Sequence, residues 1–304
     1  MTPDAADQPH RRIAREPLRA SGDILVAPEF QAALAAIGLT SLDAVFAFDR
    51  GRDLAKHNIG AHRKRLQLEV TVPGEVRPVK LYLKRYDRPP RLQQLRHWLV
   101  HGRRVSSGRA EHDTACDLAS EGVDTPHTVA CGQQWRWLFE KRSFLMTREV
   151  HASDSLERKL PACFAGPTTP QTLRQRWDFV RRLATFVRHF HRTGYRHRDL
   201  YFSHIFLSTR GTFCLIDLAR AFKPILRRRF QIKDLAQLHY SAPRDCFSRT
   251  DRLRFYLAYS GRESLGSTDK RLIIAVMKKA MHMARHSRKH KVPVPYLDRA
   301  CEAR

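Results

Sequence analysis

The stretch from Tyr195 to Phe222, YRHRDLYFSHIFLSTRGTFCLIDLARAF, decides the fold. It follows a long segment of helical periodicity and begins with the tripeptide HRD, which ends at Asp199. The apolar run IFL, a turn at 209–211 and a second apolar run, FCLI, then lead to Asp217. We therefore expect a hairpin of two short strands between the two carboxylates, which are 18 residues apart (217 minus 199).

The two carboxylates suit phosphoryl transfer from ATP. One carboxylate can accept the proton of the attacking hydroxyl, while the other holds magnesium on the phosphates. Asp199 fits the first role and Asp217 the second. Protein kinases keep an Asn five residues after the catalytic Asp for a second magnesium site, and His204 stands at that position here. The alternative is that both carboxylates are ordinary turn residues beside a hairpin.

A phosphate-binding lysine is expected upstream on a strand. The segment VKLYLKRY offers Lys84, with Lys80 as a less suitable neighbour outside the apolar alternation. The usual partner of this lysine is a glutamate on the helix of the same lobe, and Glu111 in RAEHDTACDLASEG is the candidate. Each of these residues alone is more typical of a solvent-facing charge, but their order and spacing favour a shared site.

The chain is predicted to form two lobes of an α+β fold. Residues 1–22 are expected to be a flexible basic arm, and residues 23–153 a nucleotide-binding lobe with an antiparallel sheet and one main helix. The expected strands are VFAF, RLQLEVTV, VKLYLKRY, TVACGQ, WRWLFEK and SFLMTREV. Residues 154–304 are expected to form a largely helical lobe that carries the catalytic loop and a basic C-terminal helix.

The amino-acid composition limits the classes of molecule that the chain is expected to bind. The 304 residues include 56 Lys and Arg against 30 Asp and Glu, a formal charge of +26 that attracts nucleic acid, anionic lipid or phosphorylated glycans alike. A merely solvated basic surface is the alternative. No signature of a nucleic-acid-binding module or of a Cys/His metal site appears. No apolar run matches a signal peptide or a membrane span, so we expect a cytoplasmic protein.

Several segments together resemble the bacterial lipopolysaccharide core kinases, the heptose and Kdo kinases that share a reduced protein-kinase-like fold. The similarity covers roughly residues 44–290, and HRDLYFSHIFL combined with IDLAR is its most specific part. The other matching segments are LYLKRY, AEHDTACDLASEGVDT, SFLMTREV and RRRFQIKDLAQLHYSA.

The resemblance implies a role for each candidate. Asp199 would be the catalytic carboxylate, Asp217 a magnesium ligand, Lys84 and Glu111 the pair that positions the phosphates, and His204 the replacement of the kinase Asn. These roles are carried over from the family.

Asp234, in KDLAQL, looks like the helix carboxylate that braces the HRD backbone in kinase-like folds. It follows Asp217 by 17 residues (234 minus 217), too few for a long activation segment, which argues against ordinary protein substrates. The segment DRGRDLAKHNIG lacks the GxGxxG of a phosphate-covering loop, so backbone amides or basic side chains such as Arg52 and Lys56 are left to cover the phosphates.

The implied function is transfer of phosphate from ATP, with Mg²⁺, to a heptose or Kdo hydroxyl of the lipopolysaccharide inner core. The expected partners are this anionic glycolipid and the inner-leaflet surface, with an acidic protein as a further option and no nucleic acid. The protein would then be peripheral on the cytoplasmic face of the inner membrane. The alternatives are an aminoglycoside-type phosphotransferase, a catalytically inactive kinase-like scaffold and a nucleic-acid-binding protein.

The C-terminal helix is the candidate for membrane contact. The segment TDKRLIIAVMKKAMHMARHSRKHK places its apolar residues on one helical face and Lys and Arg elsewhere. Packing against the second lobe, including the methionines, is the favoured interpretation, and contact with the inner leaflet is the alternative. The face comprises Ile273, Val276, Met277, Ala280, Met281 and Ala284.

Overall fold

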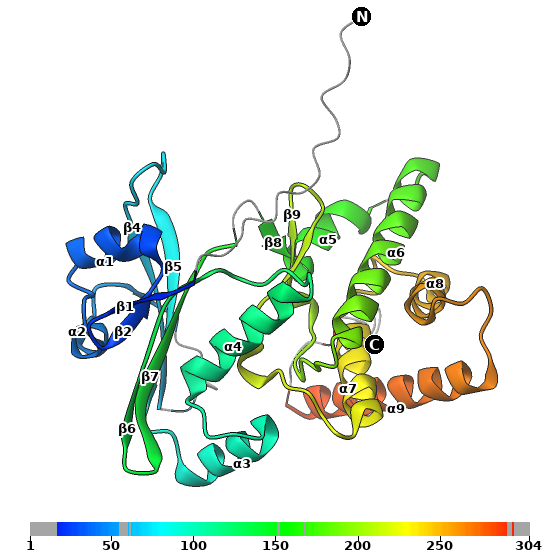
Figure 1. The fold of residues 1–304 in the computed structure, drawn as a ribbon. Helices are drawn as coiled ribbons and strands as arrows, with labels where there is room; N and C mark the ends of the chain where they lie inside the picture. The colour runs from blue at the N-terminus through cyan, green and yellow to red at the C-terminus, as the bar shows by residue number, and fades with distance from the viewer. Residues whose placement is uncertain are drawn as a thin grey trace, which may run out of the picture.

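The structure, a computed structural model, describes residues 17–54, 60, 62–150, 153–166, 168–290 and 294. These residues form two lobes, an antiparallel sheet with flanking helices and a largely helical lobe (Figure 1). The α+β class expected from the sequence is confirmed.

A seven-stranded antiparallel sheet is the framework of the first lobe. Its strand order is β1-β2-β6-β7-β5-β4-β3. The central strands pair along most of their length, with the eight residue pairs of β4 and β5 running from Arg63↔Tyr86 to Val70↔Val79. The strands are β1 (Arg19–Ser21), β2 (Ile24–Val26), β3 (Arg52–Asp53), β4 (Arg63–Val70), β5 (Val79–Asp87), β6 (Thr128–Arg136) and β7 (Phe139–Arg148).

Two details of this lobe differ from the sequence predictions. Strand β1 pairs with β2 and lies inside the segment 1–22 that was expected to be a flexible arm, of which residues 1–16 lie outside the described residues. The predicted strand WRWLFEK is instead split, because a turn at Trp137 and Leu138 ends β6 and begins β7. The three runs expected after residue 127 therefore form two long strands.

The prediction of a strand at VFAF is wrong, because this segment lies mostly within helix α2 (Leu42–Ala47). The side chain of Ser41 accepts a hydrogen bond from Ala44 N at 3.1 Å and so caps the first turn of this helix. Leu42 and Val45, three residues apart, are both buried. The short apolar run is therefore compatible with the period of a helix and with that of a strand. The cap formed by Ser41 favours the helix.

The remaining helices of the first lobe flank the sheet. The 3-10 turn η1 (Pro28–Phe30) leads directly into helix α1 (Gln31–Ala36). Helix α3 (Arg91–His101) follows the two prolines, and α4 (Ser107–Ser120) lies between the sheet and the helical lobe in Figure 1.

The hairpin predicted between Asp199 and Asp217 is confirmed. Strand β9 (Ile205–Ser208) pairs with β10 (Phe213–Leu215) on either side of a turn that includes Gly211 at φ +80°. A third short strand, β8 (Ser153–Ser155), adds to β9 and gives a three-stranded sheet in the second lobe. Two 3-10 turns flank the hairpin, η2 (Phe202–His204) before it and η3 (Leu218–Arg220) after it.

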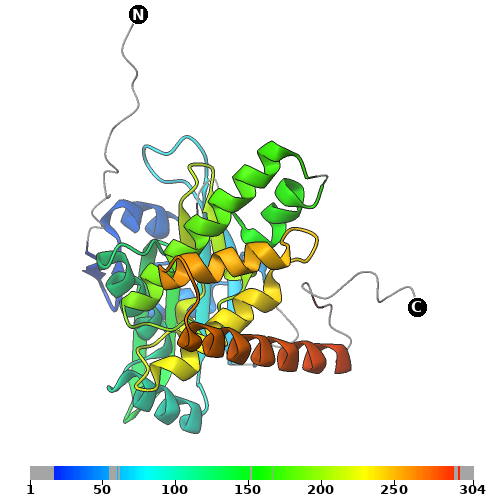
Figure 2. The ribbon, with the colours of Figure 1, turned by 90° about the vertical axis from the view of Figure 1, so that its right-hand side faces the viewer.

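The helical lobe is built on two helix pairs, in which α6 packs against α8 and α7 against α9. Figure 2 faces this lobe, with α8 and α9 on the near side. No helix of the described ranges is both long and apolar enough to cross a bilayer. The helices are α5 (Leu156–Phe164), α6 (Pro170–Arg192), α7 (Arg227–Ser241), α8 (Arg249–Ser260) and α9 (Ser267–Lys289).

Helix α9 packs against the helical lobe as the favoured interpretation expected, but Met277 and Met281 are not part of the packed face. Val276, Ala280 and Ala284 recur every four residues and are buried. Met277 and Met281 lie about 100° further round the helix and stay 46% and 50% exposed. The two methionines therefore contribute to the surface of α9 and not to the core.

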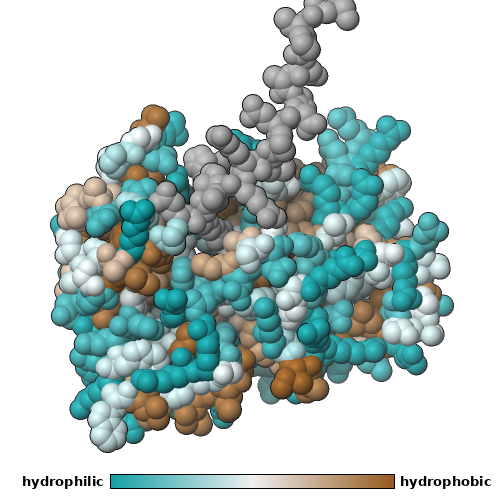
Figure 3. Space-filling model, in the orientation of Figure 1, coloured by the Kyte–Doolittle hydropathy of each residue, from teal (hydrophilic) through white to brown (hydrophobic). Residues whose placement is uncertain are grey.

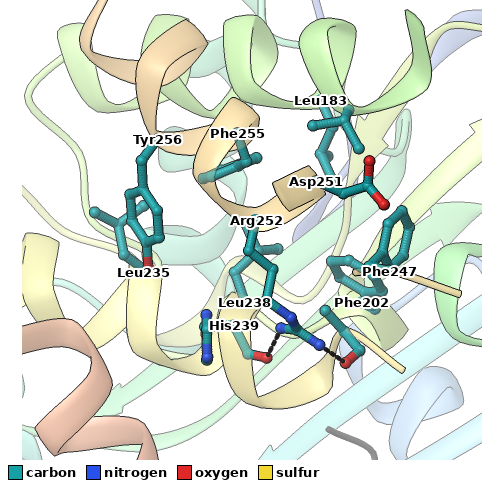
Figure 4. Close-up of a pocket in the computed structure, with 12 residues that line it drawn as sticks. Leu183, Phe202, Leu235, Leu238, His239, Phe247, Asp251, Arg252, Phe255 and Tyr256 are labelled. Atoms are coloured by element: carbon teal, nitrogen blue, oxygen red, sulfur yellow. Dashed lines mark hydrogen bonds between the residues drawn. The ribbon is translucent and has the colours of Figure 1, made fainter. Parts of the chain in front are cut away.

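A small apolar cavity of about 50 Å³ lies between α6, α7 and α8 (Figure 4). At one side the guanidinium of Arg252 donates hydrogen bonds to the carbonyl oxygens of His239 and Ala242, at 3.0 and 2.9 Å. None of the candidate site residues is among those that line this cavity. The expected chemistry therefore has to be sought between the lobes.

Helix α4 approaches strand β7 so closely that one of its positions requires glycine. A Cβ atom on Gly108 would lie 2.6 Å from the carbonyl oxygen of Phe144 and 2.8 Å from its carbonyl carbon. Backbone atoms cannot move aside as a flexible side chain can. The approach sets the distance of α4, and with it of Glu111, from the sheet.

Gly108→Ala should therefore destabilise the first lobe. We expect the free energy of unfolding to fall by about 1–3 kcal/mol, the usual cost of overpacking, as measured by urea denaturation. Gly166→Ala is the matched control, because Gly166 has a negative φ and no atom within 4 Å of its added Cβ. Equal stability of the two variants would show that α4 can shift without cost.

Candidate active site

A cleft of about 450 Å³ lies between the two lobes, and four of the residues singled out from the sequence line it, Lys84, Glu111, His204 and Asp217. Asp199 and Asp234 are not among its lining residues. The cleft volume is within the range of about 300–1,000 Å³ that is typical of small-molecule sites. Part of the wall is apolar, with Leu54, Ala115, Leu145, Ile216 and Leu218. The charged part carries Arg65, Lys84, Glu111, His204 and Asp217.

An ion-pair network joins the lobes at the charged end of this cleft. Lys84 on β5 lies 2.5 Å from Glu111 Oε1 and 3.0 Å from Asp217 Oδ1, measured from its Nζ. Glu111 is 5% exposed, and its other oxygen accepts a hydrogen bond from the hydroxyl of Tyr86 at 3.3 Å. The structure therefore brings together the lysine, the glutamate and the second carboxylate.

The charges in this network fix each other's protonation. Burial alone would lower the pKa of Lys84, but the negative charges of Asp217 and Glu111 outweigh it and raise that pKa above its ordinary value. The positive charge of Lys84 in turn holds the pKa of Asp217 well below its usual range in spite of burial, and Arg65 adds to this effect. Asp217 is therefore an ionised carboxylate at neutral pH.

Arg65 is a cleft residue that the sequence analysis missed. It lies on β4, and its Nη2 is 3.2 Å from Asp217 Oδ2 and 3.5 Å from Oδ1. The alternation of RLQLEV, with Leu66 and Leu68 in the core, places Arg65 on the opposite face of the strand. A prediction that the strand of Arg65 pairs with the strand of Lys84 would have identified Arg65.

Asp199 lies in the helical lobe beside Arg220, a second arginine that the sequence analysis missed. Arg220, in η3, donates from Nη1 to both carboxylate oxygens of Asp199 at 3.0 Å. The side chain of Arg220 is 46% exposed, whereas that of Asp199 is 22% exposed. The arginine thus holds the carboxylate in place while remaining free to move toward solvent.

A buried carboxylate braces the loop that carries Asp199. Asp234 on α7 is fully buried and accepts hydrogen bonds from the backbone N–H groups of His197 and Arg198, both at 2.8 Å. Arg198 has φ +68°, a left-handed conformation that is costly for a residue with a side chain. The two hydrogen bonds offset that strain, so the geometry predicted for Asp234 is present.

Two histidines link the loop to Asp217. The carbonyl of Ile216 lies 2.9 Å from His197 Nε2, and the carbonyl of Asp199 lies 2.7 Å from His204 Nδ1. Carbonyl oxygens only accept, so these two nitrogens carry the protons. Burial lowers the pKa of His197, which is neutral as a result. His204 Nε2 lies 3.9 Å from Asp217 Oδ2.

The donor set around Asp217 fits magnesium bound together with a nucleotide. Within the described residues, no three His, Cys, Asp or Glu side chains gather into a metal site of their own. Magnesium in phosphoryl-transfer enzymes needs only one or two carboxylates, because phosphate oxygens and waters complete its shell. Asp217 would supply the carboxylate, and the imidazole of His204 lies beside it.

The candidates for covering the phosphates are only partly described. Arg52 lies on the short edge strand β3 and is exposed. Lys56 and the turn around it lie outside the described residues. The contacts of this loop with a nucleotide therefore remain an expectation.

The two lobes, the lysine–glutamate pair and the carboxylates at the mouth of the helical lobe define a protein-kinase-like fold. The solved structure named "WaaP in complex with acyl carrier protein" agrees, with a TM-score of 0.53 and 25% identity over 82% of this chain and 90% of that one. The model of the "Lipopolysaccharide kinase (Kdo/WaaP) family" matches residues 62–259, well over half of the chain. The chain belongs to this family, as the sequence resemblance implied.

Curated relatives carry the same family name. The lipopolysaccharide core heptose(I) kinase WaaP of Escherichia coli is 31% identical over 150 residues, 47% of this chain and 56% of that protein. The WaaP of Pseudomonas aeruginosa is 31% identical over 166 residues, 52% of this chain and 61% of that protein. The chain thus spans little more than half the length of the curated relatives it matches.

Proposed function

We propose that the chain is an ATP-dependent kinase that phosphorylates a heptose or Kdo hydroxyl of the lipopolysaccharide inner core. The observation that carries this proposal is the cleft in which Lys84, Glu111 and Asp217 form one ion-pair network. Family membership selects the sugar of the lipopolysaccharide core as the acceptor.

In this proposal the chain's own residues align the two substrates. Lys84, held by Glu111, pairs with the phosphates of ATP, and magnesium held by Asp217 would neutralise charge on the transferred group. Asp199 accepts the proton of the sugar hydroxyl and aims its oxygen at the terminal phosphate. Arg220 keeps the Asp199 carboxylate oriented until the sugar hydroxyl replaces Arg220 as its hydrogen-bond donor. The apolar wall of the cleft receives the base of the nucleotide.

Asp199→Asn tests this role directly. The amide keeps the shape of the carboxylate but cannot accept a proton, so transfer from labelled ATP to dephosphorylated lipopolysaccharide core should fall about 10²–10⁴-fold. Asp178→Asn, a surface carboxylate on α6 paired with Arg181, is the matched control and should leave transfer unchanged.

The outcomes separate the competing functions. Folded protein that hydrolyses ATP without transfer to the glycan would indicate another acceptor, as in aminoglycoside-type phosphotransferases. Full transfer by Asp199→Asn would contradict the assignment of the base. Absence of all nucleotide binding by the unaltered chain would favour the inactive scaffold.

We propose in addition that the chain docks on the inner leaflet through what we call the α3–turn surface. Its members are large apolar side chains on α3 and at the β6–β7 turn that are 41–96% exposed. Figure 3 shows a group of apolar atoms along the lower edge of the molecule, where Figure 1 places α3. The α3–turn surface comprises Leu92, Leu95, Leu99, Trp137 and Leu138.

Contacts and charge support membrane docking there. Trp98 of α3 stacks on Phe139 at a centroid distance of 5.7 Å, and Arg104 donates to the carbonyl of Trp137 at 2.8 Å, so helix and turn form one surface. Exposed arginines surround it, an arrangement that suits anionic headgroups. His97 of α3 and Ala219 of η3 line one small cavity, so α3 lies near the turn that follows Asp217. The arginines are Arg91, Arg96, Arg103 and Arg104.

Flotation with vesicles of phosphatidylcholine and anionic phosphatidylglycerol tests the docking surface. Combined replacement of Leu92, Leu99 and Trp137 by Ser should weaken binding about tenfold or more, because the buried apolar area is lost. The control replaces the exposed Ile274, Met277 and Met281 of α9 by Ser and should bind as before. Weaker binding by the α9 variant, together with unchanged binding by the α3–turn variant, would place the membrane contact on α9.

An acidic protein partner is the other use we propose for the basic surface. The solved WaaP structure is a complex with acyl carrier protein, and a charge of +26 favours association with an acidic protein. Calorimetric titration with acyl carrier protein should show binding that weakens as salt rises, because salt screens surface charges. No binding at low salt would rule this partner out.

A further inference from the structure

Arg65 and Lys84 form an unusual cross-strand pair. They are direct partners in the register of β4 and β5, and both side chains line the cleft. Like charges directly opposite each other on neighbouring strands repel and destabilise a sheet. Here Asp217 lies within 3.2 Å of Arg65 Nη2 and 3.0 Å of Lys84 Nζ. The two strands thus present a pair of cations that converge on a single anionic group.

The two cations differ in the ion-pair partners that remain to them if the side chain of Asp217 turns away. Lys84 retains Glu111, whose oxygen is 2.5 Å from its ammonium. Asp217 is the ion-pair partner of Arg65, and no second carboxylate pairs with this guanidinium in the described part of the chain. Arg65 has only 28% of its side chain exposed, so an unpaired charge there would be poorly solvated. A new anion is therefore needed at this place whenever Asp217 serves a metal.

The triphosphate of the nucleotide is the anion that meets this need. A guanidinium offers a planar fork of donors that matches phosphate oxygens. The chain also lacks the GxGxxG pattern whose backbone amides usually cover these phosphates. We propose that Arg65 is a second nucleotide-binding cation, which exchanges the carboxylate of Asp217 for the β- and γ-phosphate oxygens of ATP when the cleft fills.

This inference rests on the proposed use of ATP, but not on the identity of the acceptor. It gives Arg65 two partners, the Asp217 carboxylate that it faces in the structure and the phosphate oxygens of bound ATP. It also distinguishes ATP from shorter ligands, because adenosine has no phosphate to offer. Arg65 should therefore contribute to the binding of MgATP and not to that of the nucleoside.

Binding measurements without any acceptor test the inference. Arg65→Gln should weaken MgATP binding by about 10- to 100-fold, the effect of losing a charge-assisted contact, and leave adenosine binding unchanged. Arg65→Lys, which keeps the charge and the pair with Asp217 but loses the fork, should lie in between. Lys64→Gln is the matched control, because Lys64 is the neighbouring cation on β4, is 49% exposed and faces Asp53 at 4.0 Å. It should bind both ligands as the unaltered chain does.

The results separate the inference from the proposed function. Arg65→Gln that binds MgATP as tightly as the unaltered chain, or more tightly, would overturn the inference and leave Arg65 a counter-ion of Asp217 alone. An unaltered chain that binds MgATP but phosphorylates no core sugar would remove the proposed acceptor and leave the inference standing. Loss of adenosine binding in Arg65→Gln but not in Arg65→Lys would also count against it, because it would show a general role of the charge in the cleft.

Discussion

The carboxylate of Asp217 is the charge on which the two lobes depend for their alignment at the cleft. It lies between strand β10 and the turn η3 of the helical lobe, and its cations Lys84 and Arg65 belong to the sheet lobe. Its own backbone is left-handed, with φ 59° and ψ 60°, a strained conformation for an aspartate. Strain at this residue is tolerated because ion pairs to the other lobe favour the position that it produces.

Asp234, a fully buried carboxylate, fixes the backbone of the loop that carries Asp199. Asp234 holds the backbone of His197 and Arg198, while Gln237, three residues on, donates to the Arg198 carbonyl at 2.7 Å and accepts from Leu200 N at 3.1 Å. One face of α7 thus satisfies the backbone polar groups of a loop that no strand pairs with. The loop is held by a helix, so Asp199 can project from irregular backbone without being mobile.

The sequence was most informative where chemistry and spacing coincided. Asp199, Asp217 and the hairpin between them followed from HRD, two apolar runs and one turn, and the strand of Lys84 followed from a clear period of two. The segment VFAF was misassigned because four apolar residues cannot distinguish the two periods, and the Ser41 cap that decides for a helix is a single contact. Arg65 and Arg220 were missed because their importance lies in partners 152 and 21 residues away.

The two carboxylates on either side of the hairpin are both paired with cations of this strongly basic chain. Asp217 pairs with Lys84 and Arg65, and Asp199 pairs with Arg220. In the proposed kinase, ligand binding is an exchange of anions, in which phosphate or acceptor replaces a carboxylate on the same cations. Because the cations are in place beforehand, little reorganisation is needed when substrates enter. The excess positive charge of the chain favours the approach of anions to these cations.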